Sequence, residues 1–164
     1  MVVWLSPIII TVHNAEEAAA FARLLPQVPS LLPTPFGAAA ARLTYPVLLI
    51  ALAVVSLLAL GISILAARTP KSSWGIWLVL VLQATMAINA LSHLLTAVVI
   101  FHGYAPGLIT ALLFNAPFAA YCFWRAREEH WVSGRSLAAV LPVALFVHGP
   151  VLFTGLWLAG LFAR

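Results

Sequence analysis

An imidazole and two carboxylates stand close together near the start of the chain, in the sequence His13-Asn14-Ala15-Glu16-Glu17. A helix turns about 100° per residue, so Glu16 would lie about 60° to one side of His13 and Glu17 about 40° to the other. One helix face would therefore present all three groups. Imidazole and carboxylate are ligands that suit Zn, Fe or Mn, and a positioned carboxylate can also act as a general base.

A second set of polar side chains interrupts the apolar segment 74–103. Its members recur at the spacing of one helix face and are Thr85, Asn89, Ser92, His93 and Thr96. His93 could serve as a further metal ligand, and Asn89 as a partner that orients an imidazole. The alternative is structural, because Asn and His in membrane helices often form hydrogen bonds between helices.

Hydrophobic residues make up 64% of the chain and charged residues only 7%. A soluble domain normally carries about 25% charged residues, so the composition indicates a small polytopic membrane protein. We expect one all-α membrane domain, a transmembrane helical bundle in the lipid bilayer. Apolar runs long enough to cross it predict five spans, at about 1–25, 47–67, 74–103, 106–124 and 137–162.

The first span would bury charged groups, because His13, Glu16 and Glu17 interrupt its apolar sequence. A central charge costs about 2.5–3.5 kcal/mol on insertion scales, so segment 1–25 needs partners from a surrounding bundle. The alternative is a four-span protein in which this segment lies along the interface. Its glutamates would then be solvated, or paired with Arg23 on the Glu16 face.

Proline and glycine mark the connections. Five prolines fall within residues 26–46 and predict a stiff loop there. The segment Tyr104–Thr110 contains Pro106 and Gly107 and predicts a turn between two helices, with its tyrosine anchored at the membrane interface. His148 precedes Gly149-Pro150 and either completes a site where the last helix breaks or accompanies a simple kink.

Depth in the bilayer gives an independent test of these candidates. At about 1.5 Å per residue, Glu17 lies roughly 24 Å along the first span and His93 roughly 28 Å along the third. The first and third of five spans run in the same direction, so both groups fall in the same half of the bilayer. Asn115, roughly 13 Å into the fourth span, and His148, roughly 17 Å into the fifth, fall near mid-depth. The polar groups are thus predicted to converge on one level.

Eight Lys or Arg residues against four acidic residues give a formal charge of +4. The basic residues flank the apolar segments singly or in small groups, as topogenic charges do, and do not form the clustered face that nucleic acid requires. We therefore expect no nucleic-acid partner. The more positive side is predicted to be cytoplasmic, which places the N-terminus in the cytoplasm and the C-terminus outside it. The candidate site then lies in the extracytoplasmic half.

Two further absences restrict the chemistry. The sequence contains no Asp, which excludes a Ser-His-Asp triad. Its single cysteine, Cys122, excludes a cysteine-rich metal site and an internal disulfide.

Three short motifs follow one another along the chain. His13–Glu17 matches H-x-x-E-E, Asn89–His93 matches N-x-x-x-H, and Tyr104–Thr110 matches Y-x-P-G-x-x-T. In this order they resemble the HXXEE-domain family of integral membrane proteins, over roughly residues 1–120. The family has no established activity, so the resemblance implies which positions matter and not what they do.

The leading hypothesis is an intramembrane, mononuclear site for a divalent metal ion (Zn, Fe or Mn), with His13, Glu16, Glu17 and His93 as ligands. Glu16 and Glu17 would also be the catalytic groups, acting on a lipid-like substrate through hydrolysis by metal-activated water or through oxidation. The residues expected to orient this site are Asn89, Tyr104, Thr110, Asn115 and His148.

Two alternatives belong to other functional classes. In the first, the protein is a small transporter or channel that uses the same His/Glu cluster for protons or cations. Such a short chain would have to act as a homo-oligomer. In the second, it is a structural or accessory membrane protein whose polar groups hold helices together.

Overall fold

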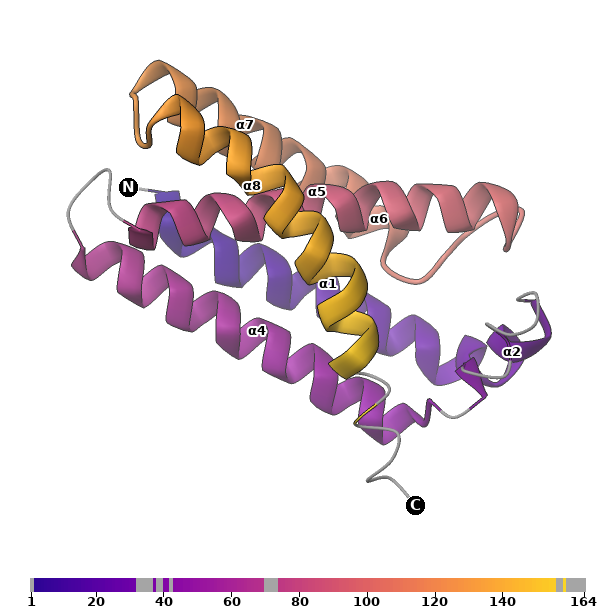
Figure 1. Ribbon diagram of the computed structural model, residues 1–164. Helices are drawn as coiled ribbons and strands as arrows, with labels where there is room; N and C mark the ends of the chain where they lie inside the picture. Colours follow the sequence, from indigo (N-terminus) through magenta and orange to yellow (C-terminus); the bar gives the residue numbers. More distant parts are fainter. Residues whose placement is uncertain are drawn as a thin grey trace.

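The computed structural model describes residues 2–31, 37, 40–41, 43–69, 74–155 and 158, and over these the chain is all-helical, as predicted. The long helices in Figure 1 are α1 (Leu5–Leu24), α4 (Tyr45–Arg68), α5 (Trp74–Val99), α7 (Ala116–Glu128) and α8 (Gly134–Phe146). The shorter elements are two 3₁₀ turns (Val2–Trp4, Leu25–Gln27), α2 (Val28–Leu31), α6 (Leu108–Thr110) and two π-helical turns (Ala111–Asn115, Val147–Val151).

Three of the described helices, not five, are long and apolar enough to cross a membrane. They are Tyr45–Arg68, Trp74–Val99 and Gly134–Gly155, the last formed by α8 with the π-helical turn and residues that follow it. The prediction of five spans is therefore wrong in two places, at segment 1–25 and at segment 106–124. The three apolar helices still fit a membrane protein, which is the class that the composition indicated.

Segments 1–25 and 106–124 do not qualify as membrane spans, for different reasons. Helix α1 is long enough, but two glutamates, a histidine and an asparagine lower its hydropathy. The segment 106–124 does not form one continuous α-helix. It begins with the short α6, passes through the π-helical turn Ala111–Asn115, and then forms α7, which has only 13 residues.

Part of the predicted proline-rich loop 26–46 also forms helix. The 3₁₀ turn at Leu25–Gln27 and the single α-helical turn of α2 lie within it, and α4 begins at Tyr45 with Pro46 in its first turn, where a missing N–H costs nothing. Residues 32–36, 38–39 and 42 of this loop lie outside the described residues.

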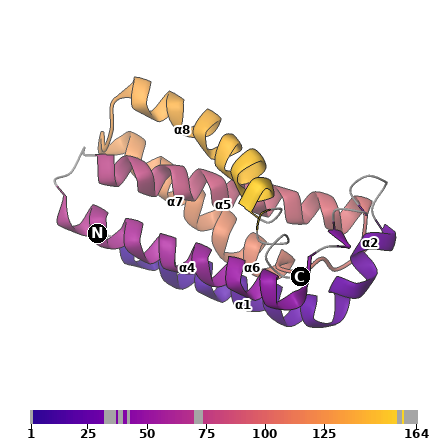
Figure 2. The same cartoon turned by 60° about the horizontal axis from the view of Figure 1, so that its bottom comes forward.

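Helix α5 is at the centre of the bundle. It packs against α4, α7 and α8, and α4 packs along α1 on the other side (Figures 1 and 2). Two hydrogen-bonded side-chain pairs, Ser6–Gln83 and His13–Asn89, connect α1 to α5, and the residue number increases along both helices from the first pair to the second. Helices α1 and α5 therefore run in the same direction, which the depth argument requires.

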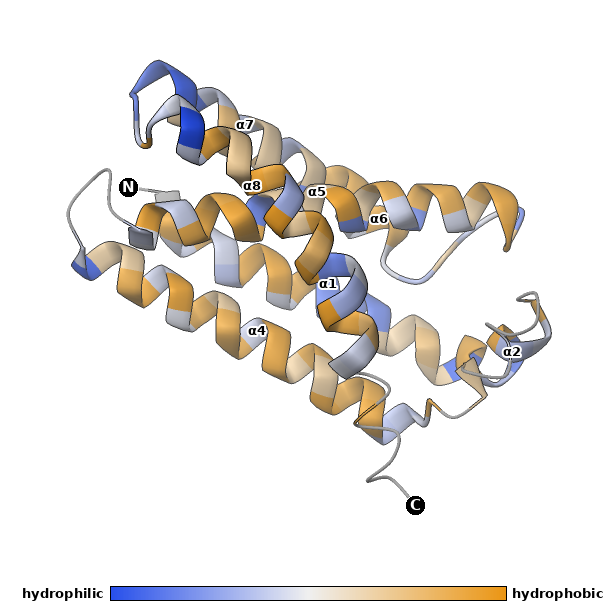
Figure 3. Cartoon of the chain, in the orientation of Figure 1, coloured by the Kyte–Doolittle hydropathy of each residue, from blue (hydrophilic) through white to orange (hydrophobic). Residues whose placement is uncertain are grey.

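The outer faces of the apolar helices suit a lipid environment. Large apolar side chains on α4, such as Ile50, Leu57 and Leu58, are exposed, and Figure 3 shows apolar residues along most of α4 and α8. Hydrophilic residues gather instead at the connection between α7 and α8. A continuous exposed apolar face on a protein indicates contact with a partner or with lipid.

Basic residues gather at one end of the bundle. Arg68 ends α4, Arg125 and Arg127 lie in the last turn of α7, and Arg135 lies in the first turn of α8. The turn that contains Tyr104 lies at the opposite end. The orientation with a cytoplasmic N-terminus stays a prediction.

Asn14 joins α1 directly to α4, as does Tyr45, whose hydroxyl donates to the Ala18 carbonyl oxygen at 3.1 Å. The Asn14 amide donates to the Leu52 carbonyl oxygen at 2.9 Å and to Ser56 Oγ at 2.9 Å. Asn14 lies on the face of α1 away from Glu16, so its contacts hold the helix in place without joining the polar cluster.

We expect Asn14→Ala to lower the free energy of unfolding by about 1 kcal/mol, because hydrogen bonds between membrane helices average about 0.6 kcal/mol each. Thermal unfolding in detergent, followed by far-UV circular dichroism, measures the change. Ser30→Ala, which removes only an exposed hydrogen bond to the Gln27 carbonyl, is the control. Equal melting temperatures for the two variants would contradict this role for Asn14.

Candidate metal centre

Three candidate ligands from two helices meet in the interior. His13 and Glu17 come from α1 and His93 comes from α5, and one ligand atom from each lies within 4.8 Å of the others. Glu17 Oε2 is 3.8 Å from His13 Nε2, and Glu17 Oε1 is 3.7 Å from His93 Nε2. The two imidazole rings meet nearly edge to face, with centroids 5.0 Å apart. This His13–Glu17–His93 group could hold a metal ion.

The group is shielded from solvent but not sealed. The side chain of His13 is 1% exposed, that of His93 11% and that of Glu17 15%. Glu17 approaches the histidines at distances beyond an ordinary hydrogen bond. Buried carboxylates need a compensating charge, and a cation among the three side chains would supply one.

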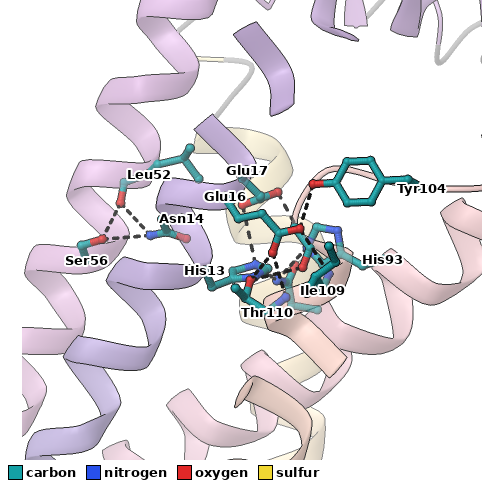
Figure 4. Close-up of polar contacts among 12 residues, drawn as sticks. His13, Asn14, Glu16, Glu17, Leu52, Ser56, His93, Tyr104, Ile109 and Thr110 are labelled. Atoms are coloured by element: carbon teal, nitrogen blue, oxygen red, sulfur yellow. Dashed lines mark hydrogen bonds and ion pairs between the residues drawn. The ribbon is translucent and has the colours of Figure 1, made fainter. Parts of the chain in front are cut away.

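Glu16 is separated from this group and serves another contact. Its Oε1 accepts hydrogen bonds from the Tyr104 hydroxyl at 2.8 Å and the Ile109 N–H at 3.2 Å. Its Oε2 accepts from the Thr110 N–H at 2.7 Å and the Thr110 hydroxyl at 2.6 Å. Figure 4 shows these bonds gathered around one carboxylate. Glu16 thereby fixes the segment from Tyr104 to Thr110 onto α1.

Tyr104 is suited to be a permanent donor in this network. Partial burial and its hydrogen bond to Glu16 raise the pKa of the phenol to about 12. The hydroxyl therefore stays protonated at neutral pH and donates a hydrogen bond to the carboxylate.

The Thr110 hydroxyl links Glu16 to His13. Its oxygen is 3.0 Å from His13 Nδ1, and a hydroxyl has only one proton to donate. Because an ionised Glu16 can only accept, Thr110 donates to it, and the Thr110 oxygen accepts from His13 Nδ1–H. In the neutral ring this leaves the lone pair on Nε2, the atom that faces Glu17 and Asn89.

Gly107 is packed against all three members of the His13–Glu17–His93 group. Its φ is +78°, in the left-handed region that favours glycine. A Cβ at this position would lie 2.8 Å from Glu17 Cγ, 2.8 Å from His13 Cε1 and 2.9 Å from His93 Cε1. The turn therefore forms one wall of the centre. Sequence reasoning assigned Gly107 only to a turn; the fixed place of this glycine in Y-x-P-G-x-x-T was the available signal.

Of the residues expected to orient the site, Asn89, Tyr104 and Thr110 lie in or beside it. The Asn89 amide nitrogen is 2.8 Å from His13 Nε2 and 3.1 Å from His93 Nε2. The other two, His148 and Asn115, form no hydrogen bond with the His13–Glu17–His93 group among the described residues. His148 Nε2 is 3.3 Å from Ser92 Oγ, and neither amide atom of the fully buried Asn115 has a hydrogen-bond partner within the described residues.

The π-helical turn explains where Asn115 lies. Its i→i+5 hydrogen bonding makes a wider turn than an α-helix, which brings a residue close to the face of the residue five positions earlier. Asn115 is five residues after Thr110, and the turn packs against both α1 and α5. Asn115 thus faces the interior about one turn below Thr110.

The motifs that build this site lie within a region of the chain that matches a known protein family. A family of proteins of unknown function with an HXXEE motif matches residues 4–122. The chain belongs to the HXXEE family. His13, Glu16 and Glu17 fit the HXXEE motif itself, and the matched region also includes His93 and the turn from Tyr104 to Thr110. No curated protein and no solved structure matches the chain significantly.

Gly107→Ala tests the wall of the centre. We expect it to destabilise the protein by roughly 2–4 kcal/mol, through the strain of a left-handed alanine and the displacement of packed side chains. Thermal unfolding measures this change. Gly103→Ala in the same turn is the control, because its Cβ would come no nearer than 3.9 Å to any neighbouring heavy atom. The close packing would be disproved if both variants unfolded at the wild-type temperature.

Proposed function

We propose that this member of the HXXEE family is a membrane-embedded metalloenzyme whose divalent ion is bound by His13, Glu17 and His93. The observation that carries the proposal is the convergence of these three side chains, with both Nε2 atoms turned toward the carboxylate of Glu17. Two helices that are far apart in the sequence supply one compact set of ligands.

The composition of the set supports catalysis over a purely structural metal site. Catalytic zinc sites keep three protein ligands and leave a position open for water or substrate, and two histidines with one carboxylate also suit Fe(II). When bound, such an ion supplies an activated water for hydrolysis or a redox centre for oxidation. The small remaining exposure of Glu17 and His93 leaves the centre accessible.

The surroundings favour an apolar, membrane-dissolved substrate. Ile109, beside Glu16, is 54% exposed, and the next turn continues with the exposed side chains Leu112, Leu113 and Phe114. A substrate with a lipid-like chain could therefore approach along the face of α6 and the π-helical turn. Hydrolysis and oxidation both stay open as reaction classes.

The two glutamates have different tasks in this proposal. All four hydrogen bonds to Glu16 come from the Tyr104–Thr110 segment, so its carboxylate positions that segment and, through Thr110, the His13 ring. Glu17 receives no comparable set of donors within the described residues, and its two oxygens face the two histidines. Glu17 is therefore the metal ligand and Glu16 a positioning residue.

A second candidate function is transport of protons or of a cation. It is favoured by buried polar groups that extend from the centre along the bundle. Asn115 is buried about one helical turn beyond Thr110. Ser6, which is seven residues before His13 on α1, accepts a hydrogen bond from Gln83 at 3.0 Å. Metal-free protein that catalysed pH-dependent uptake into liposomes, as a homo-oligomer, would support this candidate.

We expect stoichiometric bound transition metal in protein purified in detergent without chelators, measured by elemental analysis. Glu17→Gln and His93→Ala should lose the ion, because each removes one of three ligands. Glu16→Gln should keep it with affinity reduced by about 10- to 100-fold, the usual effect of losing a group that orients a ligand. Glu128→Gln, an exposed change at the other end of the bundle, should bind like the wild type.

Two results would overturn the proposal. The first is wild-type protein that binds no transition metal even when metal is added back. The second is unchanged metal content in Glu17→Gln and His93→Ala together with lower melting temperatures, which would assign these side chains to helix packing alone.

A further inference from the structure

The Asn89 amide lies where the two histidines converge. Its nitrogen is 2.8 Å from His13 Nε2 and 3.1 Å from His93 Nε2. These are the same two ring atoms that face Glu17 in the His13–Glu17–His93 group. One side-chain nitrogen thus contacts both imidazoles from within α5, four residues before His93.

The hydrogen bonds around His13 determine which end of the amide points at it. Glu16 accepts the Thr110 hydroxyl proton, so Thr110 accepts from His13 Nδ1–H. The neutral His13 ring then has a lone pair on Nε2, which needs a donor. Asn89 must therefore present its NH₂ group, and that group has two hydrogens, one for each histidine.

The same lone pairs are the ones that a metal ion would use. Metal–nitrogen bonds of about 2.0–2.1 Å would place an ion between the two Nε2 atoms, in the region that the Asn89 amide group now approaches. The amide must turn for the ion to enter. A half-turn about the last side-chain bond of Asn89 exchanges its nitrogen for its carbonyl oxygen, which is itself a metal ligand.

We propose that Asn89 is the fourth protein ligand of this centre, bonding the two histidines through its amide nitrogen without metal and the ion through its amide oxygen. The inference rests on the proposed metal site. It makes the protein's ligand set two imidazoles, one carboxylate and one amide oxygen, a mixed nitrogen and oxygen set that suits divalent Mn, Fe and Zn, and a five- or six-coordinate ion would still have a position for water or substrate. It also gives the N-x-x-x-H motif a function, since both of its named residues would bind the same ion.

Two substitutions at this position separate a ligand from a residue that only holds the histidines. Asn89→Asp keeps the shape and an oxygen donor and adds a negative charge, whereas Asn89→Leu has similar bulk and no donor or acceptor. If Asn89 is a ligand, Asp should bind the ion about tenfold or more tightly than the wild type, because affinity rises with ligand charge. Leu should bind it about tenfold or more weakly.

The measurement uses full-length protein in detergent, stripped with EDTA and titrated with Zn²⁺ against a chromophoric chelator. Ser92→Ala, three residues away and turned toward His148, is the matched control and should bind Zn²⁺ like the wild type. Circular dichroism of each metal-free variant establishes that it is folded before titration.

The outcomes separate the role of Asn89 from the existence of the metal site. Tighter binding by Asn89→Asp with weaker binding by Asn89→Leu supports the ligand assignment. Equal losses in both variants, or no change in either, overturn it while leaving the three-residue site intact. Absence of Zn²⁺ binding by the wild type overturns the proposed function itself, and the assignment of Asn89 with it.

Discussion

The single proton of the Thr110 hydroxyl holds this site together. It is donated to Glu16 at 2.6 Å, and the same oxygen accepts from His13 at 3.0 Å. Together with the Tyr104 hydroxyl and the N–H groups of Ile109 and Thr110, this side chain anchors the Tyr104–Thr110 segment to α1, and it also selects the His13 tautomer. That tautomer presents the Nε2 lone pair to Glu17 and Asn89. In metal sites, a binding histidine is commonly oriented by a group on its other ring nitrogen; in the proposed centre that group would be a hydroxyl backed by a carboxylate.

The two adjacent glutamates differ in how their charges are compensated. A charged side chain in the interior of a bundle is costly unless other groups compensate for it. Four donors compensate Glu16, three of them from two consecutive residues of one turn. Glu17 faces two imidazoles that in their neutral form offer it little compensation. Hydrogen-bond donors thus compensate the negative charge of Glu16, whereas the charge of Glu17 has no such compensation among the described residues. A cation would therefore be stabilised beside Glu17.

Much of this site follows from sequence spacing, and the remainder depends on tertiary contacts. Helical periodicity predicts His13, Glu16 and Glu17 on one helix face and Asn89 and His93 on another, and the rise per residue predicts that the two faces meet at one depth. Periodicity could not distinguish the two glutamates, because both lie at similar angles from His13. The two glutamates are distinguished only by the position of the Tyr104–Thr110 turn, which bonds to Glu16 and packs Gly107 against Glu17. The count of spans was too high for a related reason: the residues that build the site make α1 polar, and a π-helical turn divides segment 106–124.

X-ray absorption spectroscopy at the metal edge of the purified, unchelated protein tests the central claim most directly. If His13, Glu17 and His93 bind the ion, the spectrum should contain the multiple scattering of two imidazoles and oxygen or nitrogen ligands at about 2.0–2.2 Å. A bound ion without imidazole scattering, or with sulfur in its coordination sphere, would place the metal elsewhere in the protein. Either result would contradict the account given for α1 and α5.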